Sequence, residues 1–420
     1  MWIPDLAGRA GPKYLRLLEA MAEDVAKGRL AAGARLPPHR ELAWRLGVSA
    51  NTTSRAYAEG VKRGLLRGEV GRGTFVRAAG PEAEEAPPES LRRARDGPVD
   101  LSRNLPMPGL SAPHVRRALA EIAADPRLDA LLDYQTDADL ARHREAGRAW
   151  LAFGGVEAPV ERIVPTVGGQ HGLLCALTAL LQPGDLLLVE ALTYPPVLAM
   201  AARLGLRTGA VAMDAEGAVP ESFEDWCHAA RPRAFYLTPT LQAPTTATQS
   251  MARRVRIAEI AARHGVILIE DAVFAPLAGD PPPPLAALAP ECAVHVASLS
   301  KTVAPGLRVG WLAAPGPRVA ALHHAVNLSV WMTPPTTLEL ARRLIDDGAA
   351  ETLTLQHRRL AERRQRLARG VLGIETAAPA PSGFHLWMDL PEGWRADAFR
   401  AECARRGVIV SEARSFAADP

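Results

Sequence analysis

One lysine stands out as a candidate for covalent chemistry. The sequence of 420 residues contains 49 lysines and arginines, but only four of them are lysines, and Lys301 is the only lysine after residue 62. Arginine can serve as the cation at most positions, but it fails where a neutral primary amine must form, because a guanidinium does not lose its proton in proteins. Lys301 is therefore a candidate nucleophilic amine. The plain alternative is a leftover surface lysine.

Groups that suit a phosphate occur near this lysine and at one other point in the chain. Ser298 and Ser300 place two hydroxyl groups beside Lys301, and the guanidinium of Arg308 follows. Much earlier, Gly169 and Gln170 lie where an expected strand gives way to an expected helix. Small residues at a helix N-terminus let backbone N–H groups reach a phosphate, and arginine adds charge-assisted hydrogen bonds. For the glycine pair, a simple tight turn is the alternative.

Two further residues complete the description of a ligand. Asp271 ends an expected strand, where a buried carboxylate could hold a proton on a heteroaromatic nitrogen, and Tyr194 follows another strand, where it could stack on a flat ring. A helix cap or surface acid and ordinary core packing are the alternatives. Taken together, the sites describe a phosphate, a pyridine nitrogen, a flat ring and an aldehyde. These are the parts of pyridoxal 5′-phosphate, whose aldehyde would form a Schiff base with Lys301.

The elements that must position these residues alternate between short apolar runs and helical stretches from about residue 160. The expected strands are Ile163–Val167, Leu186–Glu190, Ala234–Thr238, Val266–Glu270, Ala293–Ser298 and Val309–Ala313. The alternation predicts an α/β domain around a mostly parallel central sheet. Ligands of such sheets bind at the carboxyl ends of the strands, which is where the candidate residues fall.

The first 77 residues have a different pattern. They predict a helix at 13–27, a short helix His39–Leu46, a glycine turn, a third helix that Ser49 caps, and a β-hairpin around 68–73. Helix, turn, helix and hairpin suggest a winged helix-turn-helix whose third helix enters the DNA major groove. The candidate DNA-binding residues are Arg40, Ser49, Asn51, Thr52, Thr53, Arg55, Arg72 and Gly73. A three-helix protein-interaction module is the alternative.

The charge distribution supports a nucleic-acid partner for this head. Residues 1–77 carry 14 basic and 7 acidic residues, whereas the rest of the chain carries 35 basic and 39 acidic residues. A basic head on a mildly acidic body suits a polyanion such as double-stranded DNA. Residues 78–98 contain four prolines and no periodic apolar pattern, so we expect a linker there. The expected domains are therefore 1–77 and 99–420.

Composition excludes several classes of protein. A hydrophobic content of 48% is that of a globular protein, and no apolar run is long enough to span a bilayer, so we expect no membrane partner. The start of the sequence lacks the basic and apolar regions of a secretory signal. The four cysteines are scattered singly without a CxxC spacing, which argues against a disulfide framework or a metal site. These features predict a cytoplasmic protein.

The motifs of both parts resemble known families. LPPHRELA, LGVS and GRGTFV, in this order over about residues 13–77, resemble the GntR-type winged helix, although Ala50 stands where that family usually has an arginine. VGGQHGLLCALTALLQPGD, LTYPP, LTPTLQAPTTAT, IEDAVF, SLSKTVAPGLRVGW and SGFHLWMDLP resemble the class I/II aminotransferases, which have the type I fold of enzymes that use pyridoxal phosphate. A winged helix joined to such a domain resembles the MocR-type transcriptional regulators.

The resemblance implies a role for each matching position. Lys301 would be the Schiff-base lysine, Asp271 would pair with the pyridine nitrogen, and Tyr194 would lie against the ring. The phosphate would be held by Gly169, Gln170, Ser298, Ser300 and Arg308. Tyr134 lies in a stretch, LLDYQTDADLARHREAGRAWL, whose tyrosine reaches the phosphate of the partner subunit in this family, which implies a homodimer.

Departures from the family pattern favour sensing over catalysis. Ala243 stands where aminotransferases usually have an asparagine facing the ring hydroxyl, and Phe274 stands where many have a tyrosine reaching the same oxygen. The arginine that holds the substrate carboxylate is not visible before the sequence ends at FAADP, so either the sequence is truncated or the ligand is anchored otherwise. We expect a DNA-binding regulator that senses an amino compound. The alternatives are an aminotransferase that carries a DNA-binding head, and a domain that lost the coenzyme and only dimerises.

Overall fold

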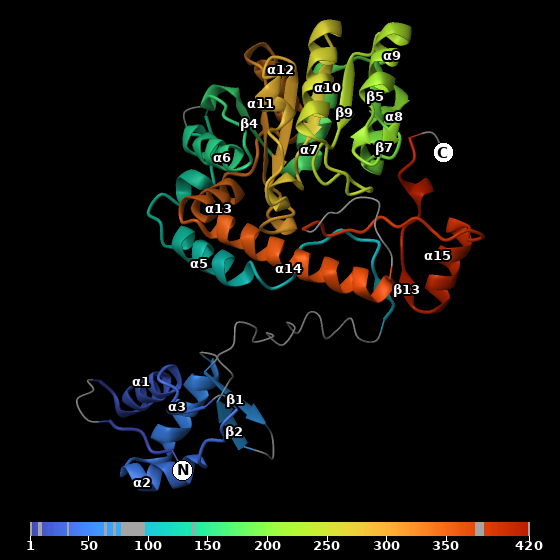
Figure 1. Cartoon of the computed structure of the whole chain (residues 1–420). Coiled ribbons are helices and arrows are strands. Elements are labelled where there is room, and N and C mark those ends of the chain that lie inside the picture. The colour runs from blue at the N-terminus through green and yellow to red at the C-terminus, as the bar shows by residue number, and fades with distance from the viewer. Residues whose placement is uncertain are drawn as a thin grey trace. The chain divides into compact units, whose positions relative to one another are not determined.

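The chain folds into two compact units, Met1–Arg92 and Arg93–Pro420 (Figure 1). The structure is a computed structural model that describes residues 2–6, 11–31, 33–62, 65–69, 73–76, 97–136, 139–373 and 382–418. Most of the expected linker at 78–98 lies outside these residues, so the domain boundaries stay a prediction. Within the described ranges, no helix has the length and apolar character needed to cross a membrane.

The N-terminal unit has the predicted order of helices followed by a hairpin. Its elements are α1 (Lys13–Ala26), α2 (His39–Leu46), α3 (Ala50–Lys62), β1 (Leu66–Glu69) and the antiparallel strand β2 (Gly73–Val76). Leu17 and Met21 of α1 pack with Leu42 of α2 and Ala56 of α3 in one buried core. Gly47 adopts the left-handed conformation at φ 60° that ends α2, a conformation that glycine reaches without steric cost. The predicted helix-turn-helix is therefore present.

The second unit is built around a seven-stranded sheet in the order β4-β12-β11-β10-β9-β5-β6. The strands are β4 (Ile163–Thr166), β5 (Leu186–Glu190), β6 (Arg207–Val211), β9 (Ala234–Leu237), β10 (Ile267–Asp271), β11 (Ala293–Ser298) and β12 (Gly310–Ala313). Only β12 runs antiparallel to its neighbours. The six expected strands are confirmed to within one residue at each end, and β6 is an additional edge strand.

Alternate residues of the strands bury opposite faces of the sheet, as the twofold repeat of a strand requires. Leu187 and Val189 of β5 belong to one core, and Leu186 and Leu188 belong to the other. The first core is covered by α7 (Gly168–Leu180), α8 (Pro195–Arg203) and α12 (Gly316–Val330). The second is covered by α9 (Pro220–Ala230), α10 (Met251–His264) and α11 (Leu285–Leu288). The result is a three-layer α/β domain (Figure 1).

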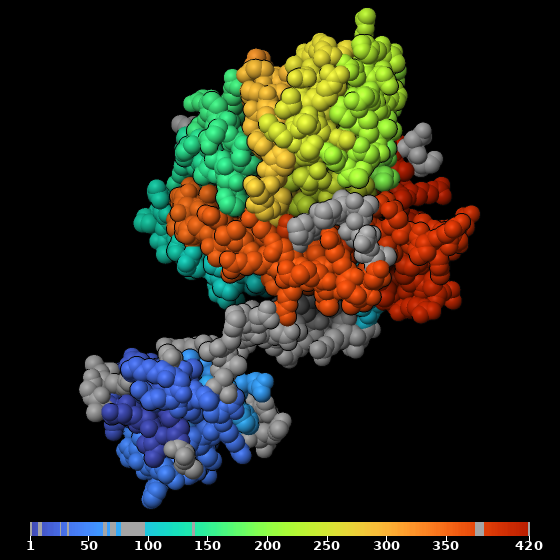
Figure 2. All heavy atoms as spheres, viewed as in Figure 1, coloured from blue at the N-terminus to red at the C-terminus, as the bar shows by residue number. Residues whose placement is uncertain are grey.

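The remaining elements lie beside this sheet. They are α5 (Ala112–Ala123), α6 (Ala141–Phe153), α13 (Pro335–Asp346), α14 (Ala349–Leu372) and α15 (Ala396–Arg405), with the short strands β3 (Val99–Asp100), β7 (Met213–Asp214), β8 (Gly217–Ala218) and β13 (Val408–Ile409). The long helix α14 lies along one side of the unit (Figure 1), and its residues, orange in Figure 2, form part of the surface there. β3 pairs in parallel with β13, so the beginning of the unit is joined to a segment more than 300 residues later.

Candidate functional site

Lys301 lies just after β11, with its side chain partly buried inside the second unit. Its Nζ donates a hydrogen bond to the backbone carbonyl of Asn104 and lies 5.0 Å from the ring centroid of Phe274. Burial lowers the pKa of Lys301, and the carboxylate of Asp271 partly opposes this shift. A lower pKa makes more of the neutral amine, which is the form that attacks a carbonyl carbon.

Asp271 ends β10, the central strand of the sheet, at its carboxyl end. Its Oδ2 accepts a hydrogen bond from the hydroxyl of Tyr236 at 2.8 Å, and its Oδ1 accepts one from the backbone N–H of Val273 at 3.1 Å. Burial raises the pKa of Asp271, and these two hydrogen bonds oppose that shift. The carboxylate is thus held in a fixed orientation, as pairing with a ligand nitrogen would require.

The residues expected to hold a phosphate surround the N-terminus of α7. A Cβ atom added to Gly168 would lie 2.7 Å from Nη2 of Arg308, and one added to Gly169 would lie 2.8 Å from Cγ2 of Val273. Nη2 of Arg308 donates to the carbonyl of Val167, at the N-cap of α7, over 3.3 Å. Neither position has room for a side chain, so the backbone packs closely in this cradle of Gly168, Gly169 and Arg308. The N–H groups at the start of α7 attract an anion there.

The two serines join the cradle from the end of β11. Oγ of Ser298 donates to the carbonyl of Val309 at 3.0 Å, and the hydroxyls of Ser298 and Ser300 are 2.9 Å apart. Ser298 is buried and Ser300 is half-buried, so the two hydroxyls extend from the core toward the surface. Through its bond to Val309, Ser298 is joined to the residue that follows Arg308.

The two tyrosines occupy different surroundings. The hydroxyl of Tyr194 donates to Oε1 of Gln170 at 3.5 Å, a long contact that brings it beside α7. Tyr134 is 73% exposed, and its ring meets the edge of Trp331, itself 66% exposed, with 6.0 Å between centroids. Tyr194 thus lies among the candidate cofactor residues, whereas Tyr134 belongs to an exposed aromatic pair on the surface of its own subunit.

In the N-terminal unit, the predicted DNA-binding residues separate into exposed and buried ones. Arg40 and Asn51 are exposed, and Ser49 caps α3 by accepting a hydrogen bond from the backbone N–H of Thr52. Arg55 is exposed but lies over the ring of Tyr14, 4.0 Å from its centroid. Gly73 begins β2 and is exposed. Arg72 lies outside the described residues.

Thr53 requires a correction. It is fully buried, and its hydroxyl donates to the carbonyls of His39 and Ala50 at 2.7 and 3.0 Å. A side chain with no exposed surface and a committed hydroxyl cannot contact a base edge. The helical repeat explains the error, because Thr53 lies on the face of α3 that packs against α2.

Comparisons with known proteins match both units. The family described as "Bacterial regulatory proteins, gntR family" matches residues 13–76, and the family described as "Aminotransferase class I and II" matches residues 98–420. A relative from Bacillus subtilis (strain 168), "Uncharacterized HTH-type transcriptional regulator YdeF", is 30% identical and aligns over 99% of this chain and 89% of its own. The chain belongs to the MocR-type transcriptional regulators.

Two further comparisons concern the cofactor of this regulator family. The "Vitamin B6 salvage pathway transcriptional repressor PtsJ" of Salmonella typhimurium is 29% identical over 95% of this chain and 90% of its own length. The structure of LysN, an alpha-aminoadipate aminotransferase from Thermus thermophilus complexed with N-(5'-phosphopyridoxyl)-L-leucine, is 25% identical. It has a TM-score of 0.68 and covers 79% of this chain and 86% of its own. The cofactor of this domain family is pyridoxal 5′-phosphate.

The residues of this MocR-type chain fit that cofactor. Gly168 lies against the guanidinium of Arg308, so a cation stands beside the N-terminus of α7. Asp271 offers a half-buried carboxylate and Lys301 a half-buried amine. The donor set matches a phosphate, a ring nitrogen and an aldehyde, each at the carboxyl-end edge of the sheet.

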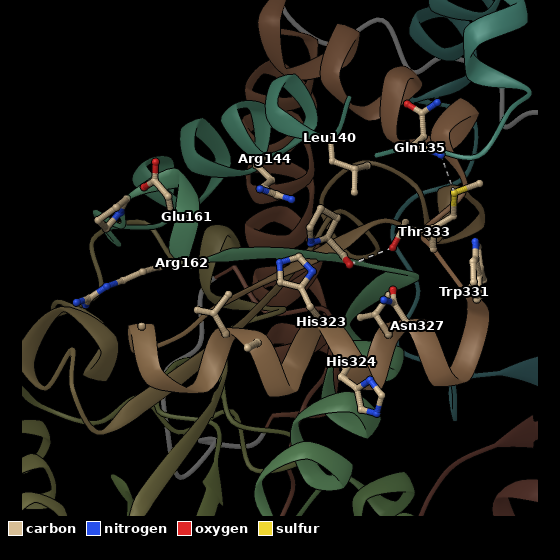
Figure 3. A pocket seen from close by; sticks show the side chains of 17 residues that line it. Gln135, Leu140, Arg144, Glu161, Arg162, His323, His324, Asn327, Trp331 and Thr333 are labelled. Atoms are coloured by element: carbon tan, nitrogen blue, oxygen red, sulfur yellow. Dashed lines mark hydrogen bonds between the residues drawn. The ribbon is translucent and has the colours of Figure 1, made fainter. Parts of the chain in front are cut away.

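A separate cavity of about 990 Å³ lies between α6 and α12. Figure 3 shows Arg144 of α6 and His323 of α12 extending into it from opposite sides. None of the predicted cofactor residues lines this cavity, although Trp331, the ring partner of Tyr134, does.

A second cluster, formed by Glu224, His228 and His264, has ligand atoms within 4.8 Å of one another on α9 and α10. Both oxygens of Glu224 already accept hydrogen bonds, from Arg256 at 2.5 Å and from Arg263. Two guanidinium groups repel a cation, so we assign no metal to this cluster.

Three residues of the site were not anticipated from the sequence. Tyr236 has the pattern of a core residue in the apolar strand β9, but a buried tyrosine hydroxyl needs a partner, and that signal could have pointed to an acid nearby. Asn104 and His385 contact each other across 281 positions. Asn104 has no sequence signature, whereas His385 lies in the motif SGFHLWMDLP, from which no role was predicted for it.

Proposed function

We propose that this MocR-type protein is a transcription regulator whose second unit binds pyridoxal phosphate at Lys301 and senses an amino compound there. When bound, the cofactor supplies an aldehyde that condenses with amines. The observation that carries the proposal is the placement of Lys301, a partly buried amine with a lowered pKa, within the electrostatic reach of Asp271. The glycine cradle and Arg308 support a phosphate in the same site.

Each residue has a stated task in this proposal. Asp271 would hold the ring nitrogen protonated, and Tyr236 would keep that carboxylate ionised and oriented. Gly169, Gln170 and the serines would offer hydrogen bonds to the phosphate, while Tyr194 would cover one face of the ring. Lys301 would attach the cofactor and yield it to an amine ligand.

A homodimer is the proposed assembly. Tyr134 and Trp331 are exposed aromatic residues, and Leu328, 71% exposed, lies on α12 nearby in sequence. Large apolar side chains that gather on a surface are typical of an interaction site, and a second copy of the chain would cover them. In such a dimer the winged helices would come in a pair, which suits two DNA half-sites.

The alternative function, turnover as an aminotransferase, has less support. Phe274 contacts both Lys301 and His385 with a ring that offers no hydroxyl, and Ala243 offers no amide. Two hydrogen-bonding groups that tune the cofactor in the enzymes are therefore replaced by apolar ones. The aminotransferase interpretation would be preferred if the purified protein steadily converted an amino acid with a keto acid acceptor.

The cofactor is tested by titrating the purified chain with pyridoxal phosphate and recording absorbance at the visible edge of the spectrum. Wild type and a Lys27→Ala control, which changes an exposed lysine, should gain the same band. Lys301→Ala should gain none. A band of equal size in Lys301→Ala would refute attachment at this position.

Binding to DNA is tested by fluorescence anisotropy, with the DNA upstream of the gene that encodes the chain as the probe. We expect affinity that falls as salt rises, because phosphate contacts release counterions. We also expect the affinity to change when amines are added to the cofactor-loaded protein, and not in Lys301→Ala. Salt-independent or undetectable binding would count against the proposal.

A further inference from the structure

Asn104 connects the reactive lysine to the segment by which the chain enters the second unit. It lies between β3 and α5, four residues after the end of β3. Its backbone carbonyl accepts the hydrogen bond from Nζ of Lys301, although the two residues are 197 positions apart. This hydrogen bond therefore exists only while the lysine nitrogen carries a hydrogen that it can donate to the carbonyl of Asn104.

The side chain of Asn104 is fixed by His385. Nε2 of His385 lies 3.0 Å from the carbonyl oxygen of Gln242, and a carbonyl only accepts, so Nε2 carries the ring hydrogen. Nδ1 is then the acceptor, and Nδ2 of Asn104 donates to it at 2.9 Å. Burial lowers the pKa of His385, which keeps the ring in this neutral form.

His385 is itself anchored to the rest of the domain. Nε2 of Gln365, on α14, donates to the carbonyls of His385 and Gly383, each at 2.8 Å. The ring of Phe274 lies 5.4 Å from the ring of His385 and 5.0 Å from Nζ of Lys301. The lysine, the asparagine and the histidine therefore share one packed environment.

By contrast, the strand that precedes Asn104 is held weakly. The N–H of Val99 donates to Gly407 at 2.7 Å, and the N–H of Leu101 donates to Ile409 at 2.9 Å. The side chains of Val99, Leu101 and Leu105 are each more than half exposed. A segment that pairs with its neighbour over two residues and buries little apolar surface opens at low free-energy cost. One further hydrogen bond therefore changes how well its amides are protected from exchange.

We propose that Asn104, held by His385, is a positioning residue that couples the chemical state of Lys301 to β3 and thus to the chain leading to the DNA-binding unit. The inference rests on the proposed function, because it requires a cofactor on Lys301. The lysine nitrogen loses its amine hydrogens as it bonds to the cofactor's carbonyl carbon, with release of water. When a ligand amine takes over that carbon, two hydrogens pass from the ligand nitrogen to Lys301, and the contact with Asn104 can form again.

Amide hydrogen exchange of the peptide 97–104 in the full chain tests the coupling. The three states are the cofactor-free protein, the protein loaded with pyridoxal phosphate, and the loaded protein after hydroxylamine, a small amine that removes the carbonyl carbon from lysine. We expect the amide of Leu101 to be well protected in the cofactor-free protein and about tenfold less protected in the loaded protein. Hydroxylamine should restore the protection. Unchanged protection in a protein that shows the visible band overturns the coupling and leaves the proposed function standing.

Two variants separate this role from simple structural support. Asn104→Ala keeps the backbone carbonyl but removes the link to His385. Ser102→Ala is the matched control, because Ser102 lies in the same loop and its hydroxyl donates to Asp100. We expect Asn104→Ala to lose the exchange difference between samples that show the visible band of the bound cofactor and samples that do not. Ser102→Ala should keep it. A full difference in Asn104→Ala, or the absence of cofactor attachment in wild type, overturns the proposal, and only the second result also overturns the proposed function.

Discussion

The hydroxyl of Tyr236 donates a hydrogen bond to Oδ2 of Asp271, with 2.8 Å between the two oxygens. Tyr236 is fully buried, and the bond opposes the rise that burial causes in the pKa of Asp271. The tyrosine therefore helps to keep ionised the carboxylate proposed to pair with the cofactor nitrogen.

Tyr236→Phe should weaken cofactor binding without abolishing it. Loss of one hydrogen bond to the carboxylate corresponds to about 1 to 1.5 kcal/mol, or about tenfold in affinity for pyridoxal phosphate. The measurement is a titration of visible absorbance. Tyr57→Phe is the control, since the hydroxyl of Tyr57 donates to Pro37 in the other unit. Equal affinity in wild type and Tyr236→Phe would show that the bond has no part in binding.

Glu190 predicts a pH dependence of stability. This carboxyl group is fully buried at the end of β5, where it accepts from the N–H of Thr238 and from Gln242, and burial raises its pKa from 4.5 to about 8. The folded state holds a proton that the unfolded chain releases. The stabilising contribution is therefore complete below about pH 4.5 and is lost as the pH rises through about 8.

Glu190→Gln should flatten that dependence. Between about pH 5 and 8, the free energy of unfolding of wild type should fall relative to that of Glu190→Gln by up to about 1.4 kcal/mol per pH unit. Urea unfolding followed by tryptophan fluorescence at several pH values measures the difference. Glu216→Gln is the control, because the pKa of Glu216 is lowered, chiefly by the hydroxyl of Ser250. Parallel curves for wild type and Glu190→Gln would contradict the assigned shift.

Several carboxylates join the helices beside the sheet. Among them, we expect replacement of Glu339 to lower the free energy of unfolding the most. Its side chain is buried and accepts from Arg342 at 2.8 Å and from Arg343 at 2.9 Å, with Nε2 of His143 at 3.4 Å. Burial by itself raises its pKa, but the hydrogen bond from Arg342 and the nearby ring of His143 hold the pKa well below its usual range. The negative charge is therefore compensated from α13 and α6.

Glu339→Gln leaves those cations without a buried counter-charge, which we expect to lower the free energy of unfolding by about 3 to 5 kcal/mol. Asp346→Asn is the matched control: the side chain of Asp346 also pairs with Arg342 but is half exposed, so it should cost less than about 1 kcal/mol. Chemical denaturation of the three proteins gives both values. A similar loss of unfolding free energy in Glu339→Gln and Asp346→Asn would refute the difference expected between a buried and an exposed carboxylate.

The sequence predicts the sheet well but not all of its edge. Four residues of β5, Leu186–Val189, form an unbroken apolar run before Glu190, which marks a strand buried on both faces. β6 went unpredicted because its sequence, RTGAV, begins with exposed residues and contains a glycine, so it lacks both a continuous apolar run and an alternating pattern.

The residues of the candidate site also fall into those that the sequence predicted and those that it did not. Lys301, Asp271 and Arg308 could be predicted because their chemistry is unusual where an expected strand ends. Asn104 and His385 could not, because their roles depend on a contact between segments 281 positions apart. Local patterns report what a residue type can do, whereas tertiary packing decides which residue it meets.

The N-terminal unit offers a crossed test of two neighbouring residues of α3. Asn51 is exposed, so Asn51→Ala should leave the thermal midpoint of this unit unchanged and weaken binding to operator DNA by about 1 to 3 kcal/mol. Thr53→Val keeps the shape of a buried side chain but removes both hydrogen bonds to His39 and Ala50, so it should destabilise the unit by about 1 to 2 kcal/mol. At a temperature where the unit is folded, Thr53→Val should bind DNA like wild type. Anisotropy titrations and thermal unfolding of the same samples measure both quantities, and a Thr53→Val protein that is fully folded yet loses DNA affinity would return Thr53 to the DNA contacts.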